Sequence, residues 1–134
     1  MTECIIGHGI DLVESSRIRT SMDEHGDRFL HRIFLPGELD YCLKQKFPER
    51  PLAARFAAKE AVSKAFGTGI GQHMTWKDIE IVRMNSGAPE CCLHGSSRDR
   101  FEKLRGTKIL ISLTHTDTIA SASVILIAAA APIS

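Results

Sequence analysis

Hydrophobic positions change their spacing along the chain, and this pattern predicts the order of the secondary-structure elements. Residues 4–13, "CIIGHGIDLV", are rich in Ile and Val and predict a first strand, which Gly7 and Gly9 loosen. Helical spacing and terminal signals then predict a series of helices, of which Ser15 and Ser16 would cap the first and Gly67 would end the longest. These helices are expected at residues 15–25, 27–34, 36–46 and 50–66. The first half of the chain is therefore mainly helical.

The second half of the chain predicts two antiparallel hairpins. A glycine-rich loop at residues 68–75 precedes two alternating segments, 76–84 and 89–95, which the turn "NSGA" separates. A helix at residues 96–106, with a serine cap and a glycine stop, is expected next. Two more strands follow, at residues 108–116 and 118–127. Because hairpins pair antiparallel, the sequence predicts an α+β fold with an antiparallel sheet and a long central helix.

The long helix carries charges in an apolar setting. Its apolar residues occupy nearly every direction around the axis, which predicts packing on several sides. A row of alanines would let another element approach closely, and it consists of Ala53, Ala57, Ala61 and Ala65. Glu60 projects near Phe56 and would lose hydration there, so it needs a strong partner such as a cation or a bound phosphate. The alternative is a surface pair of Glu60 with Lys64, worth only ~0.2–0.5 kcal/mol.

A second isolated acid, Asp11, interrupts the first strand. Acidic residues are depleted in strands, and the structural alternative is an aspartate that is hydrogen-bonded to nearby backbone. Together, Asp11 and Glu60 offer two hard oxygen ligands. Mg²⁺ typically takes one or two carboxylates and fills its other positions with water and substrate phosphates. The two acids are therefore a candidate magnesium site.

Other polar groups fit a phosphorylated ligand. The "GTGIG" loop, Gly67–Gly71, would expose backbone N–H groups to a phosphate. In "SLTHT", Ser112, Thr114 and Thr116 share one strand face and His115 lies on the other, although a lone strand histidine is more often structural. The long helix adds cations whose ordinary role is a solvated surface. These cations are Arg55, Lys59 and Lys64.

Composition limits the class of protein. With 134 residues, 43% hydrophobic and 25% charged, the chain fits one globular domain over residues 1–134. A net charge of +1 gives no electrostatic sign of nucleic-acid or membrane binding, and the longest apolar run, residues 125–131, is too short to span a bilayer. The cysteines form no CxxC motif and follow no secretory leader, so a cytoplasmic location is expected. Strand packing explains the adjacent Cys91 and Cys92 better than metal binding does.

Taken together, these motifs resemble those of the small bacterial holo-[acyl-carrier-protein] synthases, the short branch of the 4′-phosphopantetheinyl transferases. "GIDLVESSRI" (9–18) is similar to the opening motif of the family, and "FLHRIFLPGEL" (29–39) is similar to the segment that follows. "RFAAKEAVSKAFGTGIG" (55–71) is similar to the central signature, and "ISLTHT" (111–116) to the C-terminal histidine strand. The resemblance covers nearly the whole chain in the expected order.

The resemblance implies transfer of 4′-phosphopantetheine from coenzyme A to a serine of apo acyl carrier protein, a step of fatty acid biosynthesis that leaves adenosine 3′,5′-bisphosphate. By matching positions, Asp11 and Glu60 would hold Mg²⁺ against the pyrophosphate of coenzyme A, and Glu60 would help to deprotonate the serine. Lys64 would act with them. The coenzyme A site would be lined by Arg55, Lys64, Gly67, Gly69, Ser112 and His115. Arg17 and Arg28 would face the acidic carrier.

The resemblance also implies a homotrimer whose active sites lie between subunits, with Glu60 from one subunit and His115 from its neighbour. This chain departs from the family pattern in two places. Acidic side chains stand among the arginines of the carrier-facing helix, namely Asp23, Glu24 and Asp27. Ala88 stands where family members often carry a basic residue.

Two other functions use the same residues. A magnesium-dependent hydrolase of nucleotide pyrophosphates would use the carboxylates with water as the nucleophile. A noncatalytic module that binds coenzyme A or a carrier protein would bind without turnover, and the complete set of Asp11, Glu60 and Lys64 argues against it.

Overall fold

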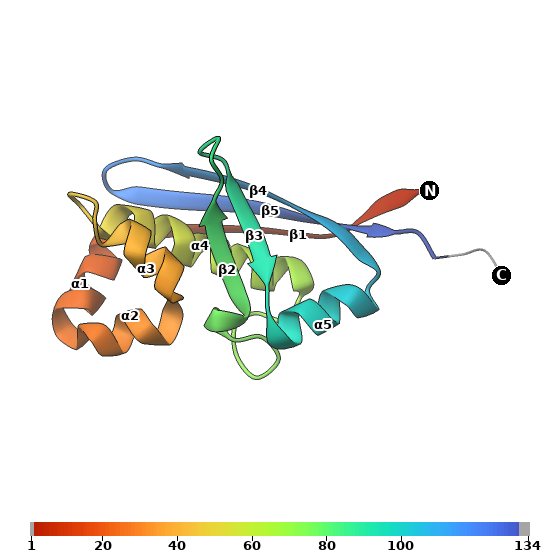
Figure 1. Ribbon diagram of the computed structural model, residues 1–134, viewed down its shortest axis with the longest axis horizontal. Coiled ribbons are helices and arrows are strands. Elements are labelled where there is room, and N and C mark those ends of the chain that lie inside the picture. The colour runs from red at the N-terminus through yellow and green to blue at the C-terminus, as the bar shows by residue number, and fades with distance from the viewer. Residues whose placement is uncertain (1, 132–134) are drawn as a thin grey trace.

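The structure is a computed structural model that describes residues 2–131. Its elements follow the predicted order (Figure 1), which confirms the α+β class. The helical elements are α1 (Ser15–His25), α2 (Asp27–Ile33), α3 (Pro36–Cys42), α4 (Glu49–Phe66), the short 3-10 turn η1 (Trp76–Asp78) and α5 (Gly95–Lys103). The strands are β1 (Glu3–Glu14), β2 (Ile79–Arg83), β3 (Pro89–Leu93), β4 (Gly106–His115) and β5 (Ile119–Ala129).

The larger sheet has three antiparallel strands in the order β1-β5-β4. In Figure 1 these long strands run side by side along the molecule, and β1 begins at the same end at which β5 finishes. The register places Asp11 of β1 opposite Ala122 of β5, and Ser112 of β4 opposite Ser123. This register therefore fixes which candidate residues share a face of the sheet.

The helix α4 packs directly against β1, and the glycines of β1 make this possible. A Cβ atom at Gly9 would overlap the carbonyl oxygen of Ala61, and one at Gly7 would overlap that of Ala65. The glycines therefore do not simply loosen the strand, because they let its backbone lie on the helix. The close approach predicted for the alanine row is confirmed at Ala61 and Ala65, which receive β1.

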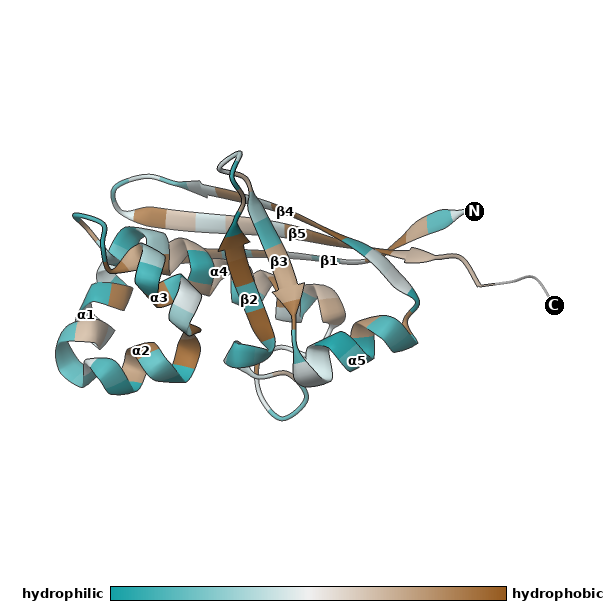
Figure 2. Cartoon of the chain, viewed as in Figure 1, coloured by the Kyte–Doolittle hydropathy of each residue, from teal (hydrophilic) through white to brown (hydrophobic). Residues whose placement is uncertain are grey.

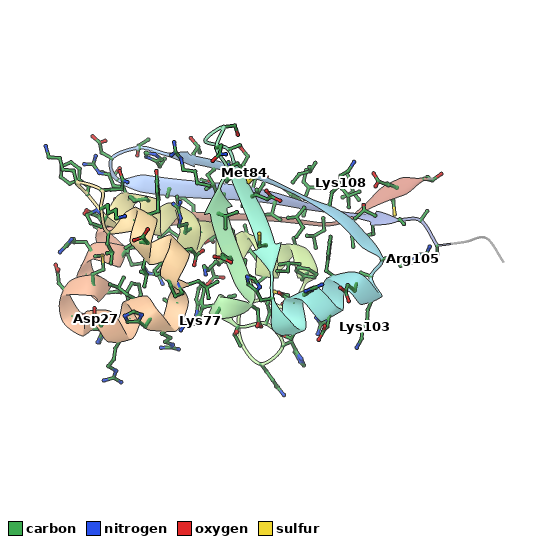
Figure 3. The ribbon with its side chains drawn as sticks, viewed as in Figure 1. Asp27, Lys77, Met84, Lys103, Arg105 and Lys108 are labelled. Atoms are coloured by element: carbon green, nitrogen blue, oxygen red, sulfur yellow. The ribbon has the colours of Figure 1, made fainter. Side chains whose placement is uncertain are left out.

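The hairpin β2–β3 forms a second sheet, which crosses the long strands in Figure 1. Ile79 and Ile81 of β2 are buried, whereas Glu80 between them is only partly covered. Figure 2 shows this alternation as a teal band between brown segments of β2. Met84 follows β2 and lies near the tip of the hairpin, where Figure 3 labels it. The hairpin, with α3 and α4, therefore frames a space beside the end of β4.

The predicted serine caps and the predicted glycine stop of the helices are wrong. The helices α1 and α5 have no side-chain cap, because the hydroxyls of Ser15 and Ser97 donate to backbone carbonyls instead, and one acceptor of Ser97 is the nearby His94. Ser15 Oγ donates to the carbonyl of Asp117 at 3.0 Å, and Ser97 Oγ donates to that of Asp78 at 2.6 Å. Gly106, the predicted stop of α5, is instead the first residue of β4. These serines connect α1 to the β4–β5 turn and α5 to η1.

Cys91 is a packing residue, as predicted, and so is Cys42. Cys42 of α3 is fully buried, and Cys91 packs against the hydrophobic core. Burial raises the pKa of the Cys42 thiol to about 11 and that of Cys91 to about 12. Both therefore stay protonated near neutral pH.

One face of the larger sheet packs on α4, and the other face, which we call the outer sheet face, is exposed. Apolar side chains lie on it, including Ile10, Leu12 and Leu110, which are 59%, 63% and 49% exposed. Ser112 and Ser123 lie on the same face. No helix in residues 2–131 is long and apolar enough to cross a membrane.

Candidate active site

Asp11 and Lys64 form an ion pair between β1 and the last turn of α4. Lys64 Nζ donates to Asp11 Oδ1 at 2.9 Å and to the carbonyl of Ile10 at 3.0 Å. The Asp11 side chain is 17% exposed and that of Lys64 is 49% exposed. Within residues 2–131, Lys64 therefore forms its ion pair with Asp11. The surface-pair alternative would require an ion pair with Glu60 instead. The close packing of β1 on α4 brings these two groups together.

Glu60 lies one helical turn before Lys64 and is partly buried. Burial raises the pKa of its carboxyl group above the ordinary value, and the charge of Asp11 raises this pKa further. The charges of Lys64 and Arg17 act in the opposite direction and lower it. Lys64 contacts Asp11 and follows Glu60 by one helical turn, and the charges of Asp11, Lys64 and Arg17 all act on the carboxyl group of Glu60. We call these four residues the carboxylate site.

The residues of the carboxylate site fit a magnesium ion. Two carboxylates in a partly buried place repel each other, and a divalent cation would stabilise both in the charged form. No group of three or more His, Cys, Asp or Glu side chains in the described part of the chain is arranged to hold a metal. A magnesium ion bound by Asp11 and Glu60 would thus take its other ligands from water and phosphate oxygens, which is its usual behaviour.

A second group of candidate residues lines a cavity of about 210 Å³, which we call the arginine cavity. Its lining comes from α3, α4, the β2–β3 hairpin and β4, and includes Tyr41, Arg55, Ile81, Arg83, Leu113 and His115. The predicted residues Arg55 and His115, which are far apart in the sequence, are therefore neighbours in this chain. The cavity is small and carries positive charge, as a phosphate subsite requires.

Arg55 is directed at this cavity with unused hydrogen-bonding capacity. The residue is 7% exposed, and its buried Nε atom has no hydrogen-bond partner among residues 2–131. Its Nη1 donates to the carbonyl of Pro51 at 3.2 Å, and its guanidinium carbon lies 4.7 Å from the ring centroid of Tyr41. The guanidinium of Arg83 lies 5.4 Å from the same ring. Because a buried guanidinium needs hydrogen-bond acceptors, an anion in the cavity would satisfy Arg55.

The carboxylate site and the arginine cavity are separate within one chain. Arg55 and Glu60 both belong to α4, but five residues rotate them by about 140° around the helix axis. The cavity lining includes neither Asp11 nor Glu60. Ser112 lies on the outer sheet face, whereas Leu113 and His115 point to the cavity. The predicted site residues thus fall into two groups, with Ser112 outside both.

The glycine loop does not form the expected cradle of free N–H groups. The N–H groups of Gly67 and Gly69 donate to the carbonyls of Lys64 and Ser63, and that of Gly71 donates to Met74. Gly67 and Gly69 have φ angles of 78° and 64°, which glycine adopts without strain. These glycines terminate α4 and turn the chain, as predicted for Gly67. Their contribution to a coenzyme A site stays a prediction.

The arginines expected to face a carrier are exposed on α1 and α2. Arg17 also lies at the carboxylate site, since its charge affects Glu60. Arg28 is in the first turn of α2 beside Asp27, and Figure 3 shows Asp27 at the opposite end of the molecule from Lys103 and Arg105. The acidic Asp23 is neutralised locally, because Arg19 contacts it at 2.9 Å.

Lys59 corrects one expectation from the sequence. The sequence predicts a cation that faces solvent or a phosphate. Lys59 is instead fully buried and lies 2.7 Å from Glu38. Sequence reasoning did not single out Glu38, Tyr41 or Arg83 as functional candidates. An acid in the first turn of α3 is an ordinary helix signal, so no pattern marked Glu38 as a buried partner.

Comparison with known proteins agrees with this geometry. A sequence model described as the 4′-phosphopantetheinyl transferase superfamily matches residues 7–121. Holo-[acyl-carrier-protein] synthase of Koribacter versatilis is 45% identical over 122 residues, which are 91% of this chain and 98% of that protein. The chain belongs to the 4′-phosphopantetheinyl transferase superfamily, in its holo-[acyl-carrier-protein] synthase branch. The predicted family and enzyme class are confirmed.

Solved structures show the same fold. The holo-[acyl-carrier-protein] synthase of Neisseria meningitidis has a TM-score of 0.85 and 32% identity, with 92% of this chain and 98% of that chain covered. The Helicobacter pylori synthase in complex with coenzyme A has a TM-score of 0.79 and 30% identity, with 89% and 98% covered. The expected fold of the transferase family is therefore confirmed.

Proposed function

We propose that this chain transfers 4′-phosphopantetheine from coenzyme A to a serine of apo acyl carrier protein and releases adenosine 3′,5′-bisphosphate. The observation that carries this proposal is the pair of complementary sites. Carboxylates beside a lysine suit a metal-bound pyrophosphate, and the arginine cavity suits a further phosphate. Relatives named holo-[acyl-carrier-protein] synthase, one of them bound to coenzyme A, support the substrate assignment.

In the proposed reaction, the serine oxygen of the carrier attacks the phosphorus that bears the pantetheine. A new P–O bond forms, the P–O bond to adenosine 3′,5′-bisphosphate breaks, and the serine proton leaves toward Glu60. Bound Mg²⁺, held by Asp11 and Glu60, would neutralise charge on the pyrophosphate oxygens. Lys64 adds a positive charge beside Asp11. Arg55 and His115 bind the nucleotide half through its 3′-phosphate.

We further propose that the working unit is a homotrimer with active sites between subunits. Two observations support this. The carboxylate site and the arginine cavity are separate within one chain, and the outer sheet face exposes Ile10, Leu12 and Leu110. A neighbouring subunit on this face would cover apolar surface and bring Ser112 into a shared site. Residues 1–134 would act as one domain, and a cytoplasmic location stays a prediction.

The decisive experiment is mass spectrometry of apo carrier protein incubated with this protein, coenzyme A and Mg²⁺. We expect the carrier to gain one phosphopantetheine on a serine, with one equivalent of adenosine 3′,5′-bisphosphate released. Release of the bisphosphate without a carrier would instead identify a pyrophosphate hydrolase. Binding of coenzyme A with no product would identify a noncatalytic module.

The metal assignment has its own test. Asp11→Asn and Glu60→Gln should each lower the rate of transfer by at least about 10²-fold. Each substitution removes a negatively charged ligand of the metal ion that stabilises the transition state. A chelator should silence the wild type, and added Mg²⁺ should restore it. Asp99→Asn, on the exposed surface of α5, is the matched control. Full activity in both site variants would exclude this metal site.

A further inference from the structure

Glu38 and Lys59 form a fully buried ion pair outside both candidate sites. Lys59 Nζ lies 2.7 Å from Glu38 Oε1, and both side chains are 0% exposed. Removal of two charges from water is costly, and an apolar pair of similar size often stabilises a fold as well or better. Stability alone is therefore a poor explanation for this pair. Its directional hydrogen bonds offer a better one.

The ammonium group of Lys59 binds three backbone carbonyls in addition to Glu38. Nζ donates to Ile33 at 3.0 Å, to Trp76 at 3.1 Å and to Ile79 at 2.7 Å. Ile33 ends α2, Trp76 begins η1 and Ile79 begins β2. One side chain of α4 therefore holds the end of α2 and the continuous stretch from η1 to the start of β2.

The carboxylate of Glu38 adds the start of α3 and makes a second contact to β2. Its Oε1 accepts the N–H of Leu35 at 2.8 Å, just before α3, and its Oε2 accepts the N–H of Ile81 at 2.9 Å in β2. The carboxylate thus fixes the start of α3 against the middle of β2. Hydrogen bonds of this kind are directional, so they set relative position more strictly than apolar contacts do.

Three of the elements that this pair connects, α3, α4 and β2, are walls of the arginine cavity. Tyr41 contributes from α3, Arg55 from α4 and Ile81 from β2. Glu38 precedes Tyr41 by about one helical turn, and Lys59 follows Arg55 by about one turn. Ile81 joins the two systems, because its N–H binds Glu38 while the residue lines the cavity.

We propose that Glu38 and Lys59 are positioning residues that hold the walls of the arginine cavity at the spacing needed for the nucleotide half of coenzyme A. They act through Tyr41, Arg55 and Ile81, since neither is accessible to a ligand. The identity of the ligand rests on the proposed function. Glu38 and Lys59 are thus the buried groups that set the affinity for that ligand. The carboxylate site does not depend on them.

The test replaces Glu38 by glutamine, which keeps the volume but removes the charge and one hydrogen-bond acceptor. We expect Glu38→Gln to raise the KM for coenzyme A and the calorimetric Kd for adenosine 3′,5′-bisphosphate roughly tenfold. The kcat at saturating coenzyme A and the KM for the carrier should stay within about twofold. Lys59→Met should act in the same direction.

Two controls separate positioning from a general loss of stability. Glu102→Gln makes the same chemical change at the exposed Arg98–Glu102 pair of α5 and should leave affinity unchanged. Leu30→Ala removes a buried side chain of α2 that does not line the cavity, so it should lower the melting temperature without changing affinity. Unchanged affinity in folded Glu38→Gln overturns the proposal. An affinity loss matched by Leu30→Ala overturns it as well.

A measurement on the wild type covers the case in which the variants do not fold. Adenosine 3′,5′-bisphosphate should slow amide hydrogen exchange at Leu35 and Ile81, because binding fixes the walls to which these N–H groups belong. If the bisphosphate slows exchange elsewhere but at neither of these amides, the proposal is overturned. It is also overturned if the wild type does not bind the bisphosphate. A wild type that binds the bisphosphate but transfers nothing to a carrier refutes the proposed function and leaves this inference standing.

Discussion

Lys64 Nζ lies 2.9 Å from Asp11 Oδ1, and this contact joins the middle of β1 to the last turn of α4. The contact exists because the backbone of β1 lies on the alanine row of α4 without side chains between them. The position of the carboxylate site is therefore set by packing at Gly7 and Gly9.

We expect Gly9→Ala to lower both stability and activity. Its Cβ would overlap the carbonyl oxygen of Ala61, so β1 must move away from α4. Overpacking of this kind costs about 1–3 kcal/mol of unfolding free energy, and the shift also displaces Asp11. Denaturant unfolding and the rate of transfer measure the two effects. Gly37→Ala in α3 is the matched control, since its Cβ meets only ordinary contact and should stabilise by up to about 1 kcal/mol.

Glu60 gives a prediction for the pH dependence of stability. Its folded pKa is raised above the ordinary value of 4.5, mainly by burial. The stability that this group contributes is therefore fully present below pH 4.5 and is lost as pH rises through the raised pKa. In metal-free protein, Glu60→Gln should raise the melting temperature at neutral pH, and the difference should vanish below pH 4.5.

Magnesium should reverse the order of thermal stability of the wild type and Glu60→Gln. Bound Mg²⁺ favours the charged carboxylate, so it should stabilise the wild type and leave Glu60→Gln almost unchanged. Thermal unfolding with and without Mg²⁺ measures both effects. A wild type that is more stable than the variant at neutral pH without metal would contradict the predicted shift.

Arg17 and Arg28 should differ in effect, although both are expected to face the carrier. Replacement of either by glutamate should raise the KM for an acidic carrier, because attraction becomes repulsion. Only Arg17→Glu should also raise the pKa of Glu60, since the charge of Arg17 lowers that pKa. Carbon NMR of the Glu60 carboxyl group, together with carrier kinetics, separates the two roles. Calorimetry should show coenzyme A affinity nearly unchanged in Arg28→Glu, and a collapse there would place Arg28 at the nucleotide site.

A shared site between subunits predicts complementation. Glu60→Ala and His115→Ala should each be poor enzymes, but activity should return when they are unfolded and refolded together. With equal random mixing, about a quarter of the interfaces would combine an intact Glu60 with an intact His115. Transfer assays on the refolded mixture measure this fraction. A mixture no more active than the average of its parents would mean that both residues act within one chain.

The local signals in the sequence were sufficient for most of the fold. The length of α4, its end at Gly67 and both hairpins follow from spacing and turn residues, and the structure confirms them. The serine caps failed for a physical reason. A serine before a helix is an adequate local signal for a cap. The hydroxyls of Ser15 and Ser97 instead donate to the carbonyls of Asp117 and Asp78, which lie far away in the sequence, and no local pattern reveals such contacts.

The candidate site was predictable where a residue conflicted with its surroundings. Asp11 in a strand and Glu60 on an apolar helix stood out for this reason, and the structure brings them close enough to affect each other. Lys59 was also out of place, but its partner Glu38 comes from another helix. Tyr41 and Arg83 are ordinary surface residue types, and only the tertiary fold gathers them around Arg55.

The buried thiol of Cys42 makes the core of this protein open to kinetic measurement. A thiol-reactive probe attacks the thiolate, and Cys42 is both fully covered and held in the protonated form. Labelling at Cys42 therefore requires α3 to separate from the core, so its rate reports how often this happens. Exposed Cys4 reacts without any opening and provides an internal reference in the same molecule.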